Sequence, residues 1–216
     1  MSARVLISPR YRIPAWVLVG LCWAVTITLG ARYAGTQHAG WLDTVLIQQI
    51  HTTVGDQNWV AQLLVSPSSP LMLCAVVVLS AVLGLAAGRW EFALLAAVAP
   101  LLALAIVELV GKPMADRRMA GYLSYPSGHT VGTLSVLTVA MLGLAAGPSI
   151  GRRVMAILVW IVISGAVMVG LVAMDYHYPT DTFAGLGVAL GIVLPLAMLA
   201  DAMTVRRYRR SATIRR

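Results

Sequence analysis

Long apolar runs separated by short polar segments dominate this chain. A bilayer core about 30 Å thick is crossed by roughly twenty helical residues. Six runs are long enough, at about 14–30, 70–88, 91–110, 130–147, 154–174 and 181–203. Because backbone N–H and C=O groups in lipid must be bonded internally, we expect each run to form a helix. The pattern predicts an all-α fold, a bundle of six transmembrane helices.

The segment 33–69, between the first two runs, is less apolar. Its apolar residues recur near helical spacing with polar residues between them, which predicts a short amphipathic helix at the membrane interface. The apolar positions are Leu42, Val45, Leu46, Ile47 and Ile50, and the polar ones are Asp43, Gln48 and Gln49. Trp41 and Trp59 are expected to be interface anchors, and His38 and His51 to lie in loop or headgroup surroundings.

The composition agrees with a membrane protein. Hydrophobic residues make up 59% of the 216 residues and charged residues 11%, far from globular averages. No polar or low-complexity linker divides the chain, so we expect a single domain over residues 1–216. Cys22 and Cys74 lie inside apolar runs, where cysteines pack as small hydrophobic residues.

The basic residues predict the orientation in the membrane. Six spans place both termini on one side, together with twelve of the sixteen basic residues, and cytoplasmic loops carry the excess of Lys and Arg. The net charge of +8 therefore indicates orientation and not nucleic-acid binding. The twelve are Arg4, Arg10, Arg12, Arg89, Arg152, Arg153, Arg206, Arg207, Arg209, Arg210, Arg215 and Arg216; the remaining four are Arg32, Lys112, Arg117 and Arg118.

Three of the four basic residues outside the cytoplasm lie in one polar stretch, Lys112–Thr130. The stretch ends in Pro-Ser-Gly-His-Thr at the start of an apolar run. A helix N-terminus offers unpaired N–H groups, and Lys and Arg add full charge, so the stretch suits a phosphate group. Glu108 precedes Lys112 by four residues, a spacing that favours a helical ion pair. Asp201, at the other end, is expected to be a solvated partner of the arginine tail.

A second polar cluster, 175–181, joins the last two spans on the same side of the membrane. His177 and Asp181 are four residues apart, so the carboxylate is expected to reach back to one imidazole nitrogen. Such a contact fixes the tautomer and leaves the other nitrogen as nucleophile or base. A metal site built from His129, His177 and Asp181 is conceivable, but the surrounding cations argue against it.

The order of these motifs resembles the type 2 phosphatidic acid phosphatase superfamily, in particular its membrane-bound bacterial members. The resemblance lies in Lys112, in the Pro-Ser-Gly-His element at 126–129 and in the His-x-x-x-Asp element at 177–181. It implies that His177 is a nucleophile forming a phosphohistidine, that Asp181 orients it, and that His129 is the general acid. It further implies that Lys112, Ser127 and Gly128 hold the phosphoryl oxygens, without cofactor or metal.

The chain departs from the family pattern at two arginine positions. The Arg-Pro pair that usually follows the lysine is replaced by Met119 and Ala120, and the Ser-Arg pair upstream of the nucleophile by Gly170 and Leu171. Arg117 and Arg118 are the available substitutes for phosphate binding.

The resemblance implies an integral-membrane phosphatase that hydrolyses a lipid phosphomonoester or diphosphate, with its active site outside the cytoplasm. A polyprenyl diphosphate is the leading substrate and phosphatidic acid the next. Two alternatives stay open: a lipid phosphotransferase using the same site, and a non-catalytic protein that binds lipid phosphates. The sequence leaves the oligomeric state open.

Overall fold

The computed structural model describes residues 5–54, 58–147 and 149–214. Within these ranges the predicted all-α fold is confirmed, since six helical segments are long and apolar enough to cross a membrane and the only strands form one two-residue hairpin. Arg4, Arg215 and Arg216 lie outside the described residues. The six segments are Pro9–Tyr33, Asn58–Ala86, Trp90–Ala115, Gly128–Ala145, Ile150–Ala173 and Pro179–Tyr208.

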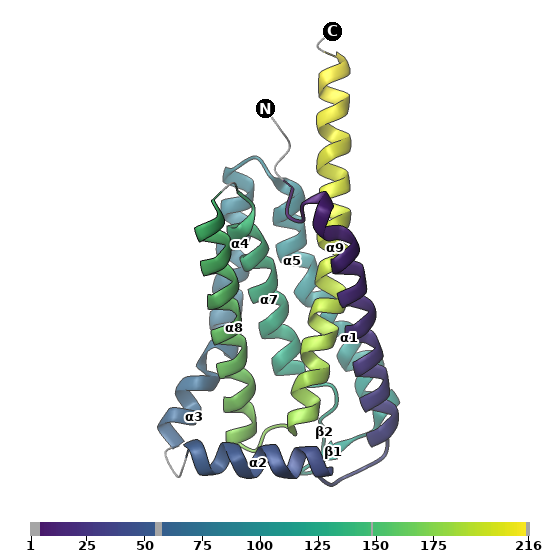
Figure 1. Ribbon diagram of the computed structural model, residues 1–216, viewed down its shortest axis with the longest axis vertical. Coiled ribbons are helices and arrows are strands. Elements are labelled where there is room, and N and C mark those ends of the chain that lie inside the picture. Colours follow the sequence, from purple (N-terminus) through teal and green to yellow (C-terminus); the bar gives the residue numbers. More distant parts are fainter. Residues whose placement is uncertain (1–4, 55–57, 148, 215–216) are drawn as a thin grey trace.

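The helices run along one long axis, with both termini at one end and the β-hairpin at the other (Figure 1). The end with the hairpin also carries α2, which lies across the bundle and not along it. The elements are η1 (Pro9–Tyr11), α1 (Arg12–Tyr33), α2 (Trp41–Val54), α3 (Asn58–Val65), η2 (Ser66–Ser68), α4 (Pro70–Ala86), α5 (Trp90–Ile106), η3 (Val107–Gly111), α6 (Lys112–Ala115), β1 (Arg118–Met119), β2 (Tyr122–Leu123), α7 (Gly128–Ala145), α8 (Ile150–Ala173) and α9 (Pro179–Ile214).

Helix α9 is the central element and packs against α1, α5 and α7. Small residues allow this close packing, as is common between helices in membranes. At Gly191, for example, an added Cβ would lie 2.7 Å from Nε1 of Trp23, which donates a hydrogen bond to the Gly191 carbonyl at 3.3 Å. The middle of α9 is thereby held close to α1.

The segment between the first two spans contains one helix more than predicted. The expected amphipathic helix is α2, but α3 follows it and leads through the 3₁₀ turn η2 into α4. Ser69 caps α4 by accepting a hydrogen bond from the Met72 N–H at 3.4 Å, and Pro70 occupies the first turn, where a missing N–H costs nothing. The second span therefore begins earlier than the predicted 70, at Asn58.

The third span continues beyond its predicted end at 110 through η3, a π-helical turn, and α6 to Ala115. Pro113 has no N–H, so the carbonyl of Leu109 cannot receive the usual α-helical hydrogen bond, and the wider turn lies at this point. The helix ends where Asp116 adopts a left-handed conformation, with φ of 44°. Lys112 therefore lies on a helix and not in a loop.

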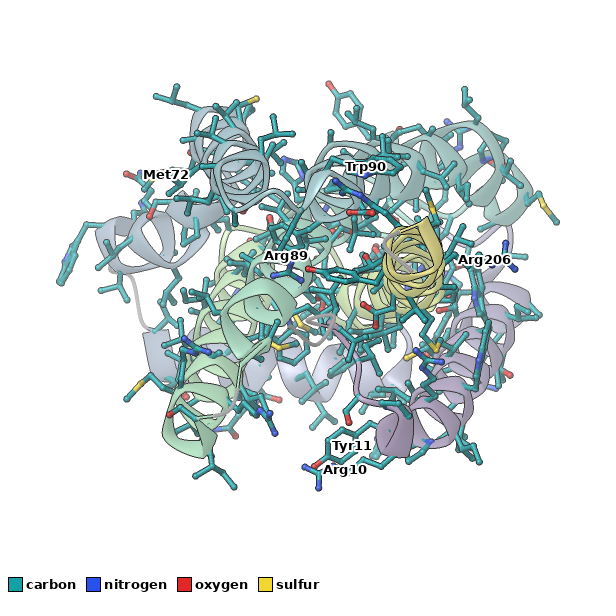
Figure 2. All side chains as sticks on the ribbon, turned by 90° about the horizontal axis from the view of Figure 1, so that it is seen from above. Arg10, Tyr11, Met72, Arg89, Trp90 and Arg206 are labelled. Atoms are coloured by element: carbon teal, nitrogen blue, oxygen red, sulfur yellow. The ribbon has the colours of Figure 1, made fainter. Side chains whose placement is uncertain are left out.

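Asp201 is not a solvated partner of the arginine tail, contrary to the expectation. It is 1% exposed and accepts hydrogen bonds from the backbone N–H groups of Leu6 at 2.7 Å and Ile7 at 2.9 Å. Figure 2 views the bundle from the end that carries the termini. In this view Arg89 lies inside the ring of helices and Arg10 at its edge. The buried carboxylate binds backbone donors because a short N-terminal segment packs against α9 at Asp201.

Candidate active site

The β-hairpin and a short connection bring the polar stretch to the start of α7. In the hairpin Arg118 pairs with Leu123, and the Ser124 N–H donates to the Arg117 carbonyl at 2.8 Å. Ser127 then caps α7, since its Oγ accepts hydrogen bonds from the N–H and hydroxyl of Thr130 at 3.2 and 3.0 Å. The predicted helix therefore starts at Gly128, inside the Pro-Ser-Gly-His element and two residues earlier than expected.

The start of α7 is joined to the start of α9. The N–H of Ser127 donates to the carbonyl of Asp181 at 3.0 Å. At Gly185 an added Cβ would lie 2.8 Å from Cβ of Thr130, so the two helices touch here without room for a side chain. The two polar clusters that the sequence placed on one side of the membrane thus meet at one point.

His129 and His177 face each other at this junction. Nδ1 of His129 lies 3.5 Å from Nε2 of His177. Nδ1 of His177 lies 3.1 Å from the carbonyl oxygen of Ser124. A carbonyl only accepts, so Nδ1 of His177 donates to it, and Nε2 is directed at His129. Nε2 is therefore the ring nitrogen of His177 that does not bond to the backbone.

Asp181 does not form the expected hydrogen bond to the imidazole of His177. Its Oδ2 lies 3.9 Å from Nδ1 of His177, beyond hydrogen-bond distance, and the Ser124 carbonyl takes that position. Oδ2 accepts a hydrogen bond from the N–H of Tyr178 at 3.2 Å, which caps α9, and Oδ1 accepts one from Nη1 of Arg117 at 2.6 Å. The carboxylate is an orienting group for the helix start and for an arginine.

Arg117, one of the two candidate phosphate ligands, is fully buried. Its guanidinium also pairs with Asp43, with Nη2 2.6 Å from Oδ2, and all three side chains are 0% exposed. In this arrangement a phosphate group cannot reach Arg117. Arg118 is exposed on the hairpin and pairs with Asp116 at 2.9 Å.

Asp43 is the site residue that sequence reasoning missed. The pattern of α2 placed it on the polar face of an interfacial helix, yet it is 0% exposed. Its Oδ1 accepts a hydrogen bond from the Thr180 N–H at 2.9 Å, and its Oδ2 one from the Gly40 N–H at 3.1 Å. An acidic residue in the first turn of a helix is a common capping signal, and nothing in the local sequence indicates its distant partners.

Lys112 lies over the start of α7, as the candidate cradle requires. It forms the predicted ion pair with Glu108, with Nζ 2.6 Å from Oε1. A Cβ added to Gly128 would lie 2.8 Å from this Oε1 and 3.7 Å from Nζ, so the pair lies directly over the backbone of Gly128. The first N–H groups of α7 have no acceptor inside the helix, and together with Lys112 they form a positively polarised surface.

At position 171, where the sequence resemblance implies an arginine, the side chain belongs to the packed core. Leu171 is 0% exposed. A Cβ added to the neighbouring Gly170 would lie 2.8 Å from Cβ of Leu64 on α3. The helix α3 therefore packs tightly against α8 at this position, and the structure offers apolar contacts where the family pattern has a cation.

Two cavities lie near the site. One, of about 220 Å³, adjoins His129 and Tyr176 and is bounded by the segment 62–70, including Ser66 and Ser68. A larger one, of about 340 Å³, lies between α1 and the segment 106–115 and is lined almost entirely by apolar side chains. Only the first borders a histidine of the site.

Two tyrosines enclose the buried arginine and the connection before α7. Burial raises the pKa of Tyr178, with Arg117 opposing and Asp181 reinforcing this effect, and burial likewise raises the pKa of Tyr125. Both phenols therefore stay neutral and act as donors, Tyr178 to the Gln37 carbonyl at 3.3 Å and Tyr125 to the Thr26 carbonyl.

Among residues 5–54, 58–147 and 149–214, no group of three or more His, Cys, Asp or Glu side chains is arranged to hold a metal ion. Comparisons with protein-family models, with curated proteins and with solved structures give no match.

Proposed function

We propose that this chain is an integral-membrane lipid phosphatase that acts through a phosphohistidine on His177. One observation supports this most directly. Nε2 of His177, the ring nitrogen that does not face the Ser124 carbonyl, lies 3.5 Å from Nδ1 of His129, and both histidines adjoin a helix N-terminus beneath Lys112. Nucleophile, acid and anion cradle are the parts that phosphoryl transfer needs.

In the first half-reaction, Nε2 of His177 bonds to phosphorus while the bond from phosphorus to the lipid oxygen breaks. His129, in its protonated form, gives that oxygen its proton. In the second half, a water oxygen bonds to phosphorus, the bond to His177 breaks, and His129 takes the proton from the water. The charge on the phosphoryl oxygens is held by Lys112 and the first N–H groups of α7.

The proposed substrate is a lipid phosphomonoester or diphosphate, either a polyprenyl diphosphate or a phosphatidic acid. The site lies at the end of the bundle opposite the termini (Figure 1). A lipid headgroup would meet water at such an end if the six apolar helices cross the bilayer. With the arginine-rich termini in the cytoplasm, this end faces outside the cell.

The test is release of phosphate from these two lipids by purified protein in detergent, without added metal. His129→Ala is expected to reduce turnover about 10²–10⁴-fold, the usual contribution of general acid catalysis. With labelled substrate, wild type forms an acid-labile phosphoprotein that His177→Ala does not form. The matched control is His38→Ala, in an exposed loop, with unchanged turnover. Full activity in His177→Ala would show that the covalent mechanism is wrong.

A second candidate function is binding of lipid phosphates without turnover. It is favoured by the pairing of the cationic side chains with carboxylates. Lys112 is neutralised by Glu108, and Arg117 is enclosed by two carboxylates. Such a protein would bind a lipid phosphate in the detergent assay and release no phosphate. If label passes instead from the donor lipid to another lipid, the reaction is a phosphotransfer.

A further inference from the structure

The Arg117 guanidinium donates three side-chain hydrogen bonds next to the candidate site. Nη1 donates to Oδ1 of Asp181 at 2.6 Å and to Oγ1 of Thr180 at 2.7 Å, and Nη2 donates to Oδ2 of Asp43 at 2.6 Å. The acceptors come from two distant elements, α2 and the start of α9. A planar guanidinium fork holds such partners in fixed directions, which a lysine cannot do.

Aromatic rings close the remaining two faces of this guanidinium. Its Cζ lies 4.2 Å from the ring centroid of Tyr33 and 4.2 Å from that of Tyr178. The side chain is thus fixed in plane by carboxylates and out of plane by rings. Buried ion pairs of this kind contribute little net stability compared with apolar packing. We therefore infer that these pairs serve to fix the positions of the groups that they join.

Two routes lead from Arg117 to the imidazole of His177. Through its side chain, Arg117 holds Asp181, whose Oδ2 lies 3.9 Å from Nδ1 of His177. Through its backbone, Arg117 accepts a hydrogen bond from the Ser124 N–H at 2.8 Å, and the Ser124 carbonyl faces Nδ1 at 3.1 Å. Arg117 therefore bonds to both of the residues, Asp181 and Ser124, whose oxygen atoms lie near Nδ1.

We propose that Asp43, acting through Arg117, is a positioning residue for His177, an inference that rests on the proposed function. Asp43 fixes the second arm of the guanidinium and also holds the start of α9 through the Thr180 N–H at 2.9 Å. Helix α2, lying across the end of the bundle (Figure 1), is thereby a structural part of the site. Its docking keeps Nε2 of His177 directed at the phosphate.

The test is Asp43→Asn, which keeps the size of the side chain and removes its charge. The expected result is a kcat at least about 10-fold lower, because misplacement by about 1 Å can cost 10²-fold, with KM for the lipid phosphate unchanged because Lys112 and α7 are untouched. The matched control on the same helix is Gln48→Ala, an exposed position with no expected effect on either constant.

A second readout does not depend on turnover. In protein labelled with ¹⁵N-histidine, wild type and Gln48→Ala are expected to show His177 as one tautomer, protonated at Nδ1, and Asp43→Asn a mixture of tautomers. If Asp43→Asn does not purify as a monodisperse protein, Thr180→Val removes a different acceptor of the same guanidinium and gives the same change to a smaller degree.

The outcomes separate the two proposals. If wild type releases no phosphate, the proposed function is wrong, and the tautomer of His177 alone decides the role of Asp43. If the variants keep a single Nδ1–H tautomer, or if kcat of an active protein stays within about twofold, Asp43 and Arg117 serve folding only and the positioning role is wrong.

Discussion

Gly185 is the position at which the candidate site is most sensitive to a single methyl group. In Gly185→Ala the new Cβ would lie 2.8 Å from Cβ of Thr130 and 3.0 Å from the carbonyl oxygen of Ser127. Carbon atoms in contact prefer about 3.5–4.0 Å, so the starts of α7 and α9 must separate by roughly 0.7–1.2 Å. Gly165 is the matched control, because a Cβ added there meets nothing within 4 Å.

The magnitude follows from comparing the two variants. Both gain the helix propensity of alanine over glycine, about 1 kcal/mol, so this term cancels in the difference. Overpacking costs about 1–3 kcal/mol, and it applies only to Gly185→Ala. For a chain of this size each kcal/mol corresponds to about 2–4 °C in the midpoint of thermal unfolding. We therefore expect Gly185→Ala to unfold at a lower temperature than Gly165→Ala by at least that amount.

Thermal unfolding in detergent, followed by tryptophan fluorescence, measures this difference. Under the proposed function, Gly185→Ala also lowers turnover by roughly 10-fold or more, since it displaces the first turn of α7 on which the phosphate is held. Equal unfolding midpoints for the two variants would refute the close approach of α7 and α9. Equal turnover at unequal midpoints would refute only the placement of the phosphate at the start of α7.

Two further predictions concern charged side chains. Asp201→Ala leaves the N–H groups of Leu6 and Ile7 without their acceptor, which costs about 1–3 kcal/mol of stability for a buried group. Hydrogen exchange at these two amides is therefore expected to accelerate. Unchanged protection of the amides would contradict the buried contact. Glu108→Gln removes the charge that neutralises Lys112, so KM for a lipid phosphate is expected to fall in the detergent assay. An increase in KM would show that Glu108 positions the lysine and does not compete with the substrate.

The six spans could be predicted from local sequence, although the second and fifth begin earlier than predicted, at Asn58 and Ile150. Apolar length alone identifies a membrane-spanning helix because backbone groups in lipid have no other partners. The starts of α4, α7 and α8 follow from serine caps, at Ser69, Ser127 and Ser149, each accepting from an N–H three residues later. The helix α3 was missed because it is short, and its role depends on packing against α8.

Some parts of the candidate site could be predicted from local spacing and topology, whereas others depend on how the helices pack. His129 and His177 lie at the same end of the bundle because His129 is in the first turn of α7 and His177 just precedes α9, and these two helices start at that end. The contact between Lys112 and Glu108 follows from helical spacing. Whether Arg117 and Arg118 reach a phosphate does not follow, since they are neighbours in sequence and yet one is enclosed and the other exposed.

The sequence by itself determined the number of spans, the common end of the two polar clusters and the i,i+4 pair of Glu108 and Lys112, because these depend on composition, length and local spacing. Only the tertiary structure decided which charges are paired over long distances in the chain. Asp43 and Asp201 read as solvated polar positions, yet both are buried against donors far away in the chain. A periodic pattern specifies which face of a helix is polar, whereas the partner that meets that face is set by how the helices pack.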